Sequence, residues 1–249
     1  MNKKNKPAKD RIILSLDVDD IQSAEKLVKK LKNYVSTFKV GINLFTAEGP
    51  KIFDIIHNEG AKVYYDSKYH DLPHTIAKAA EVLVKQKVDF FSLHIIGGST
   101  MIEACVEATN NIVKDTEQNK PIIFGITILT SIGQKTLKKE LGVPGTTQDH
   151  CLRLAKIAKK SGLDGIVVGG CDLKFISNEV DKNLIILTTA IRPAWATLND
   201  QKRVLTPKEA IEAGSDYLLI GRPVTQAEDP VSAIMLIIDE VEEAIEGNI

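Results

Sequence analysis

Cysteine is scarce in this sequence, with three in 249 residues, and no two of them form a C-x-x-C pair. Cys105, Cys151 and Cys171 lie far apart, which argues against a zinc site or a disulfide framework and is typical of a reducing compartment. We therefore expect a cytoplasmic protein. No apolar run reaches membrane-spanning length. The basic, polar stretch 1–10 has no apolar segment behind it, so we expect a short disordered tail rather than a signal peptide.

The sequence also lacks a net charge of either sign. Its formal net charge is −1, which gives no electrostatic reason to expect nucleic acid or a membrane as a partner. Hydrophobic residues make up 43% of the chain and charged residues 26%, values near the globular average that exclude extensive disorder. A chain of this length can form a complete α/β barrel as one domain.

Short β-branched runs alternate with helical patterns from end to end. The expected strands are 12–16, 37–40, 61–65, 90–94, 122–126, 165–168, 184–187 and 217–220. The expected helices are 21–31, 49–58, 75–86, 99–110, 147–160, 173–178, 207–213 and 231–247. Several helices end at a glycine before the next strand, as left-handed C-caps require. Eight such units predict a single-domain (β/α)8 TIM barrel over residues 11–249.

A doubly wound open sheet is the alternative fold. It would need a glycine-rich phosphate loop after the first strand, and the segment 17–20, Asp-Val-Asp-Asp, is not one. The barrel has a further consequence, because active sites of this fold lie at the C-terminal ends of the strands. The residues expected there are Asp17, Lys39, Asp66 with Lys68, His94, Thr127 to Thr130, Gly169-Gly170, Arg192 and Gly221-Arg222.

The segment from Asp66 to Thr75 is the most informative part of the chain. It follows the apolar run 61–65 and carries Asp66, Lys68 and Asp71 at D-x-K-x-x-D spacing. Alternation along a strand places the first two on one side of its end. An amine between two carboxylates stays protonated, so it can deliver a proton to a carbon that has gained a lone pair. A surface ion-pair cluster is the alternative for the triplet taken alone.

The loops after the seventh and eighth strands usually bind phosphate in this fold. Gly221 would let backbone N–H groups approach an anion, and Arg222 could grip it bidentately. The alternative is a barrel-closing turn with an exposed arginine. Arg192 precedes a stretch without helical period, 193–201, which we interpret as a mobile lid whose Gln201 donates an amide hydrogen bond. An ordinary surface loop is the alternative there.

In this order and spacing, the motifs resemble the orotidine 5′-monophosphate decarboxylase family, above all its bacterial form. The resemblance covers nearly the whole chain and rests on Leu16–Asp19, Phe38–Gly41, Asp66–Thr75, Leu129–Ser131, Ile191–Pro193, Asp200–Pro207 and Tyr217–Pro223. It implies decarboxylation of orotidine 5′-monophosphate to UMP and CO2, without cofactor or metal, as the last step of de novo UMP synthesis.

The resemblance also implies roles for individual residues. Lys68 would give a proton to C6 of the pyrimidine, Asp66 would crowd the substrate carboxylate, and Lys39 and Asp71 would complete the charged network. The other implied contacts are Asp17 and Lys39 with the ribose, Thr130 with the pyrimidine edge, and Arg192, Gln201, Gly221 and Arg222 with the phosphate. The family equivalents of Asp71 and Thr75 reach into the partner's site, which implies a homodimer with shared active sites.

Four positions depart from the family's usual residues. His74 stands for asparagine, Ser67 for an apolar residue, and Thr189-Ala190 for the Pro-Gly that often precedes Ile-Arg. None of these departures removes a charged group, so they concern local geometry rather than the reaction.

Two other functions stay open. Keto-gulonate-phosphate decarboxylases and hexulose-phosphate synthases share the D-x-K-x-x-D element but bind Mg²⁺ through a glutamate at the end of the second strand. Lys39 occupies that position here, and its charge would repel the metal ion. A non-catalytic nucleotide-binding barrel is the third possibility, which retention of the whole charged network disfavours.

Overall fold

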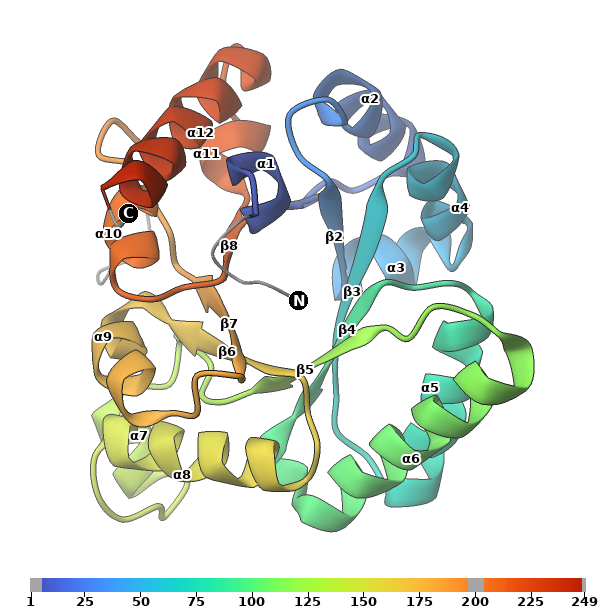
Figure 1. The fold of residues 1–249 in the computed structure, drawn as a ribbon, viewed down its shortest axis with the longest axis vertical. Helices are drawn as coiled ribbons and strands as arrows, with labels where there is room; N and C mark the ends of the chain where they lie inside the picture. Colours follow the sequence, from blue (N-terminus) through green and yellow to red (C-terminus); the bar gives the residue numbers. More distant parts are fainter. Residues whose placement is uncertain (1–5, 197–203, 248–249) are drawn as a thin grey trace.

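The computed structural model describes residues 6–196 and 204–247. Eight parallel strands follow one another around a closed barrel, because β1 pairs with β8 as well as with β2 (Figure 1). The strands are β1 (Ile12–Ser15), β2 (Thr37–Gly41), β3 (Lys62–Tyr69), β4 (Phe90–His94), β5 (Ile122–Ile126), β6 (Gly165–Gly169), β7 (Ile185–Thr189) and β8 (Tyr217–Ile220). The predicted fold class is confirmed.

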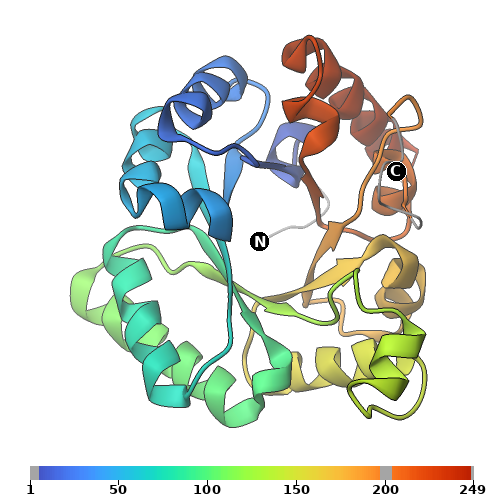
Figure 2. The same cartoon turned by 180° about the vertical axis from the view of Figure 1, so that it is seen from behind.

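Helices surround the barrel on the outside, as Figure 2 shows from the opposite end. They are α1 (Ala8–Arg11), α2 (Ile21–Leu31), α3 (Ile42–Glu48), α4 (Lys51–Asn58), α5 (Pro73–Lys85), α6 (Ser99–Thr116), α7 (Gln134–Lys139), α8 (Thr147–Lys160), α9 (Gly170–Glu179), α10 (Pro207–Glu212), α11 (Arg222–Thr225) and α12 (Pro230–Glu246), with a 3₁₀ turn, η2 (Ile95–Gly97). No helix in the described ranges has the length and apolar character needed to cross a bilayer.

The apolar core has two layers, separated by the strands. Alternate residues of each strand face opposite sides, so Ile13 lies inside the barrel while Ile12 and Leu14 pack against the helices. The inner layer draws aromatic rings from β3, β4, β5 and β8 into contact, and the rings of Phe124 and Tyr217 lie 6.3 Å apart. Because both faces are buried, the strands read as nearly continuous apolar runs.

Local signals explain where the helices begin and end. Asp20 and Asp229 accept hydrogen bonds from backbone N–H groups in the first turns of α2 and α12. A capping box opens α8, where Thr146 and Asp149 bond each other's backbone. The predicted glycine C-caps are confirmed: Gly60, Gly162 and Gly214 have φ of 76°, 86° and 98°, a conformation that residues with a Cβ rarely adopt. These caps return the chain to the next strand.

The structure departs from the sequence expectations mainly in short elements. Helices α3, α7 and α11 were not expected, since seven residues or fewer show too little periodicity to be distinguished from a loop. The third strand continues to Tyr69, four residues beyond the expected end. Its pairing with β4 shifts register between Tyr65 and Tyr69, so this last part is distorted. This distortion lies at the motif that the sequence singles out.

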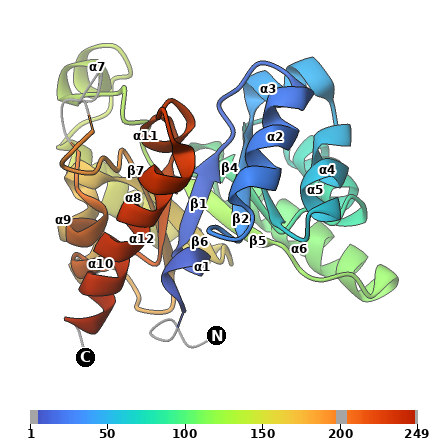
Figure 3. The ribbon, with the colours of Figure 1, turned by 90° about the horizontal axis from the view of Figure 1, so that it is seen from above.

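The expectation of a disordered tail over residues 1–10 is corrected for its last part. Ala8–Arg11 forms α1, Ala8 is buried, and the Lys6 ammonium donates a 2.5 Å hydrogen bond to the Tyr217 hydroxyl. α1 precedes β1 and therefore lies at the N-terminal end of the barrel, opposite α3, α7 and α11 (Figure 3). Residues 1–5 lie outside the described residues. At this end of the barrel, α1 packs against β1, β8 and α12.

Candidate active site

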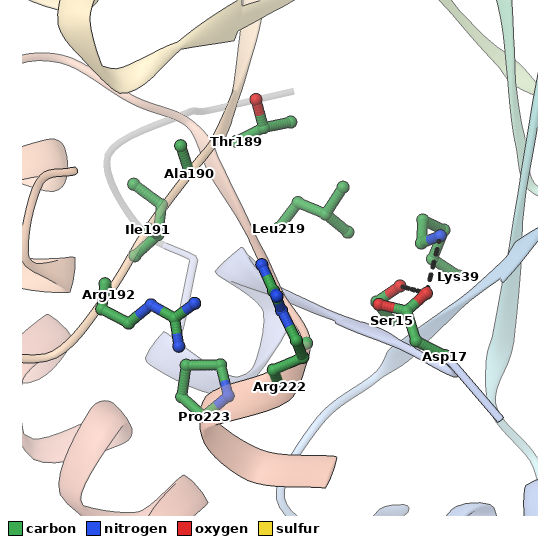
Figure 4. A pocket seen from close by; sticks show the side chains of 11 residues that line it. Ser15, Asp17, Lys39, Thr189, Ala190, Ile191, Arg192, Leu219, Arg222 and Pro223 are labelled. Atoms are coloured by element: carbon green, nitrogen blue, oxygen red, sulfur yellow. Dashed lines mark hydrogen bonds and ion pairs between the residues drawn. The ribbon is translucent and has the colours of Figure 1, made fainter. Parts of the chain in front are cut away.

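Two adjoining cavities open at the C-terminal ends of the strands and share Asp17 and Lys39. The smaller, of about 180 Å³, lies between the ends of β1, β2, β7 and β8 (Figure 4). Its lining residues are Ser15, Asp17, Lys39, Thr189, Ala190, Ile191, Arg192, Leu219, Gly221, Arg222 and Pro223. The larger, of about 430 Å³, is lined by Leu16, Asp17, Val18, Lys39, Gly41, Ile42, Asn43, Leu44, Asp66, Ser67 and Lys68. The charged residues predicted from the first three strands therefore share one mouth.

Asp66 and Lys68 form the ion pair at the base of the larger cavity, with Nζ of Lys68 2.5 Å from Oδ2 of Asp66. The other carboxylate oxygen, Oδ1, accepts hydrogen bonds from the Ser92 hydroxyl at 2.8 Å and the Tyr64 hydroxyl at 3.2 Å. Asp66 is 5% exposed, whereas the Lys68 side chain is 38% exposed. The carboxylate is therefore held in place, and the ammonium group faces the cavity.

The environment of Asp66 keeps its carboxylate ionised. Burial alone would raise its pKa, but the ammonium groups of Lys68 and Lys39 and the hydrogen bonds from Lys68 and Ser92 outweigh burial and lower the pKa below its usual value. A buried carboxylate that remains charged needs this many partners, because an unpaired charge in a protein interior is costly. The result is a fixed negative charge beside an accessible positive one.

A second ion pair joins the two cavities. Nζ of Lys39 lies 3.3 Å from Oδ1 of Asp17, and the Ser15 hydroxyl donates to the same oxygen at 2.7 Å. In Figure 4 these three side chains lie on one side of the smaller cavity, opposite Arg192 and Arg222. Lys39 is buried, and its charge lowers the pKa of Asp66 as the charge of Lys68 does. It therefore links the Asp17–Lys39 pair electrostatically to the Asp66–Lys68 pair.

The backbone at Lys68 is unusual. Its φ is 52°, a left-handed conformation, and the pairing of β3 with β4 shifts register between Tyr65 and Tyr69. The bulge carries Lys68 out of the regular ladder, and a non-glycine residue holds that conformation only where its surroundings impose it. Regular alternation alone would predict the side of the strand correctly but not this displaced backbone.

The cationic side of the smaller cavity comes from the loops after β7 and β8. Arg192 is buried, and its backbone N–H donates to the Leu205 carbonyl at 2.9 Å, which anchors the segment after β7. Arg222 begins α11, directly after Gly221. A Cβ on Gly221 would lie 2.9 Å from Oδ2 of Asp17, so any larger residue at this turn would require the aspartate side chain to shift. Gln201, predicted to contact the phosphate, lies outside the described residues.

Three predicted site residues do not join the charged network within this chain. Asp71 and Thr75 are exposed, and Oδ1 of Asp71 accepts a bond from the Leu72 backbone N–H at 2.6 Å. Thr130 is exposed after β5, close to the end of β6, where a Cβ on Gly169 would meet its methyl group at 3.0 Å. The Thr127 hydroxyl instead donates to the Val167 carbonyl at 2.7 Å, which is a structural bond between neighbouring strand ends.

Sequence reasoning missed the polar groups that support the charges. Ser15 and Tyr64 each stand two residues before a predicted aspartate, and Ser92 stands two residues before the end of β4. Alternation therefore places all three side chains on the inner side of the barrel. A buried serine in an otherwise apolar strand was the available signal for Ser92. Among the described residues, no three histidine, cysteine or acidic side chains gather so as to hold a metal ion.

Comparison with known proteins gives the family. The model of the Orotidine 5′-phosphate decarboxylase / HUMPS family matches residues 10–237. The chain belongs to this family. The orotidine 5′-phosphate decarboxylase of Moorella thermoacetica is 39% identical over 235 residues, covering 94% of this chain and 93% of the relative. That of Syntrophotalea carbinolica is 40% identical over 239 residues, covering 96% and 98%.

A solved relative has the same architecture. The orotidine 5′-phosphate decarboxylase of Lactobacillus acidophilus superposes with a TM-score of 0.82 at 31% identity, covering 93% of this chain and 99% of that one. The family resemblance drawn from the motifs is therefore confirmed, and it extends across both cavities.

One departure from the family pattern coincides with backbone strain. Ala190, where the family often has glycine, has a φ of 60° at the rim of the smaller cavity. Left-handed backbone costs a residue with a Cβ roughly 1–2 kcal/mol, whereas glycine adopts it freely. The chain therefore carries a local cost next to Arg192.

We predict that Ala190→Gly stabilises the protein by about 0.5–1 kcal/mol, since relief of the strain exceeds the entropy that glycine adds to the unfolded chain. Denaturant unfolding measures the change. Ala213→Gly is the matched control, because Ala213 ends α10 with an ordinary φ of −77°; there glycine should destabilise by about 0.5–1 kcal/mol. An Ala190→Gly variant no more stable than wild type would contradict the assignment of strain.

Proposed function

We propose that this chain catalyses the metal- and cofactor-free decarboxylation of orotidine 5′-monophosphate to UMP and CO2, the last step of de novo pyrimidine nucleotide synthesis. The observation that carries this proposal is the Asp66–Lys68 ion pair, with a held carboxylate and an ammonium group that faces a cavity. Membership of the decarboxylase family supports the reaction class.

The chemistry explains why fixed charges are needed. Departure of CO2 leaves an electron pair on C6 of the pyrimidine, and no neighbouring group of the ring can delocalise it. Stabilisation must come from positive charge already in place, and we assign that role and the subsequent proton transfer to the Lys68 ammonium. Asp66 lies beside it as a negative charge that the substrate carboxylate would be forced to approach, and loss of CO2 relieves the repulsion.

The smaller cavity fits the rest of the nucleotide. We assign Arg192, Arg222 and the turn at Gly221 to the phosphate, together with Gln201 from the segment outside the described residues. Asp17 and Lys39, at the junction of the cavities, are assigned to the ribose. Thr130, across the mouth, is assigned to the pyrimidine edge. Phosphate binding far from C6 can then contribute to assembling the reacting end of the site.

A homodimer with shared sites accounts for the residues that the single chain leaves aside. Asp71 and Thr75 are exposed at the mouth, although Asp71 belongs to the charged motif. Large apolar side chains are exposed after three successive strands, Ile42 at 69%, Leu72 at 62% and Ile96 at 55%. Such a group of residues favours a surface covered by another chain. We therefore assign Asp71 and Thr75 to the partner's site.

The three cysteines are free thiols, and Cys105 and Cys151 are buried within α6 and α8. Burial raises the pKa of each of these two thiols to about 12, so both remain protonated at neutral pH. Reduced cysteines support the proposed cytoplasmic location.

We predict that EDTA leaves decarboxylation intact. In the Mg²⁺-dependent barrels a glutamate would stand where Lys39 stands, and the Lys39 ammonium already pairs with Asp17. The assay is the loss of orotidine monophosphate absorbance with and without chelator. Inhibition by EDTA that Mg²⁺ restores would instead favour the sugar-phosphate chemistry of the family's other branch.

We predict that Arg222→Ala raises KM markedly and lowers kcat/KM by about 2–5 kcal/mol equivalents, because a charge-assisted contact to the phosphate is lost. Arg222→Lys keeps the charge but not the bidentate geometry, so its kcat/KM should lie between those of Arg222→Ala and the wild type. Steady-state kinetics decide, and unchanged kinetics in Arg222→Ala would remove this residue from the phosphate site.

The strongest prediction combines Lys68 and Asp71. Lys68→Ala should abolish activity because no other group in the motif supplies the proton, and Asp71→Ala should be severely impaired. When the two variants are mixed under subunit exchange, activity should return to about a quarter of wild type per total site, since half the dimers are hybrids and half of their sites are whole.

The mixing experiment needs an independent measure of exchange, such as energy transfer between labelled subunits. With exchange demonstrated, activity that stays at the level of the separate variants would show that Asp71 acts within its own chain. The shared-site arrangement would then be abandoned, while the proposed reaction would stand on the activity of the wild type.

A further inference from the structure

Ser92 lies in the middle of β4 and is fully buried, and both its hydroxyl and its carbonyl bond the bulge of β3. Its hydroxyl donates to Oδ1 of Asp66 at 2.8 Å and accepts the backbone N–H of Lys68 at 3.0 Å. Its carbonyl accepts the Ser67 hydroxyl at 3.1 Å. One residue of the neighbouring strand therefore contacts each member of the Asp66-Ser67-Lys68 segment.

These bonds replace the ladder that the bulge interrupts. Pairing of β3 with β4 is regular up to Tyr65 and resumes at Tyr69. Between them, the N–H of Lys68 reaches a hydroxyl instead of a backbone carbonyl, and its φ of 52° is the conformation that directs it there. A backbone N–H left without a partner would be destabilising, so the hydroxyl stabilises the left-handed backbone directly.

We propose that Ser92 is a positioning residue for the decarboxylation, which fixes the Asp66 carboxylate and the Lys68 backbone relative to each other. This inference rests on the proposed function. Ser92 lines neither cavity, so it acts through the two charged residues and not on the substrate. Serine suits the role because its hydroxyl has one hydrogen to donate and lone pairs to accept, and the structure uses both.

The same contacts give a role to Ser67, the departure from an apolar residue in the family's motif. Its hydroxyl bonds the Ser92 carbonyl, which has lost its place in the ladder beside the bulge. The bulge is therefore attached to β4 at two points. The Ser67 hydroxyl bonds the Ser92 carbonyl, and the Lys68 N–H bonds the Ser92 hydroxyl. Tyr64 supports Asp66 from within β3 and leaves Ser92 as the link between strands.

The test compares variants of Ser92 in the full-length enzyme with orotidine 5′-monophosphate as substrate. Ser92→Ala removes the hydroxyl, and Ser92→Cys keeps the volume but replaces it by a weak donor. Both should lower kcat about 10- to 100-fold, the effect of one hydrogen bond to a charged group. KM and the dissociation constant of UMP should stay within about twofold, because the phosphate and ribose contacts are intact.

Two further variants separate positioning from a purely structural role. Ser92→Thr restores the hydroxyl and should recover most of the lost kcat. Ser215→Ala is the matched control, since Ser215 is also buried, bonds Thr188 and the Tyr217 carbonyl, and lines neither cavity. It should lose comparable thermal stability while kcat stays within about twofold of wild type.

The outcomes are distinct. A Ser92→Ala variant with lowered stability and unchanged kcat, like Ser215→Ala, overturns the inference, as does a variant that loses UMP affinity in proportion to kcat. If Ser92→Ala does not fold, Ser67→Ala decides: a fall in kcat of about 3- to 10-fold at constant KM supports the proposal, and no change overturns it. A wild type that leaves orotidine 5′-monophosphate unchanged but binds UMP rejects the proposed function instead.

Discussion

The site depends on keeping one carboxylate charged in a buried position. Asp66 is almost fully removed from solvent, and burial by itself favours its neutral form. Two ammonium groups and the Ser92 hydroxyl reverse that preference, and they come from β2, β3 and β4. Three strands must therefore be in register before the charge is stable, so the electrostatics of the site are inseparable from closure of this side of the barrel.

The second ion pair extends this dependence to the phosphate side. Lys39 contacts Asp17 and its charge also acts on Asp66, and a Cβ at Gly221 would lie close enough to the Asp17 carboxylate to displace it. Interactions therefore link β3 through β2 and β1 to the turn after β8. Under the proposed function, a phosphate bound near Arg222 would act electrostatically on Asp17, Lys39 and Asp66 in turn. Binding energy at the phosphate can in that way support charge placement at C6.

The sequence predicted the fold and the charged residues but not their support. Eight strands were readable because each is buried on both faces and separated by a capped helix, and 90–94, 122–126 and 217–220 match to the residue. Asp17, Lys39, Asp66 and Lys68 were brought together by the rule that strand ends converge. Ser92 and Tyr64 were missed, because a hydroxyl that bonds a carboxylate has no periodic signature. The bulge was missed because it breaks the alternation on which strand prediction rests.

The two strained residues at the site differ in what they contribute. Under the proposed function Lys68 must carry an ammonium group, so glycine could not relieve its left-handed backbone without losing the chemistry, and the bond from its N–H to the Ser92 hydroxyl of β4 holds it. Ala190 contributes only a methyl group at φ 60°, and the segment is anchored two residues later at Arg192. Lys87 and Glu117, the other left-handed non-glycine residues among those described, follow helix ends, where the conformation is common. Under the proposed function, strain at Lys68 is thus tied to the chemistry, while strain at Ala190 is tied to the path of the chain and is open to replacement.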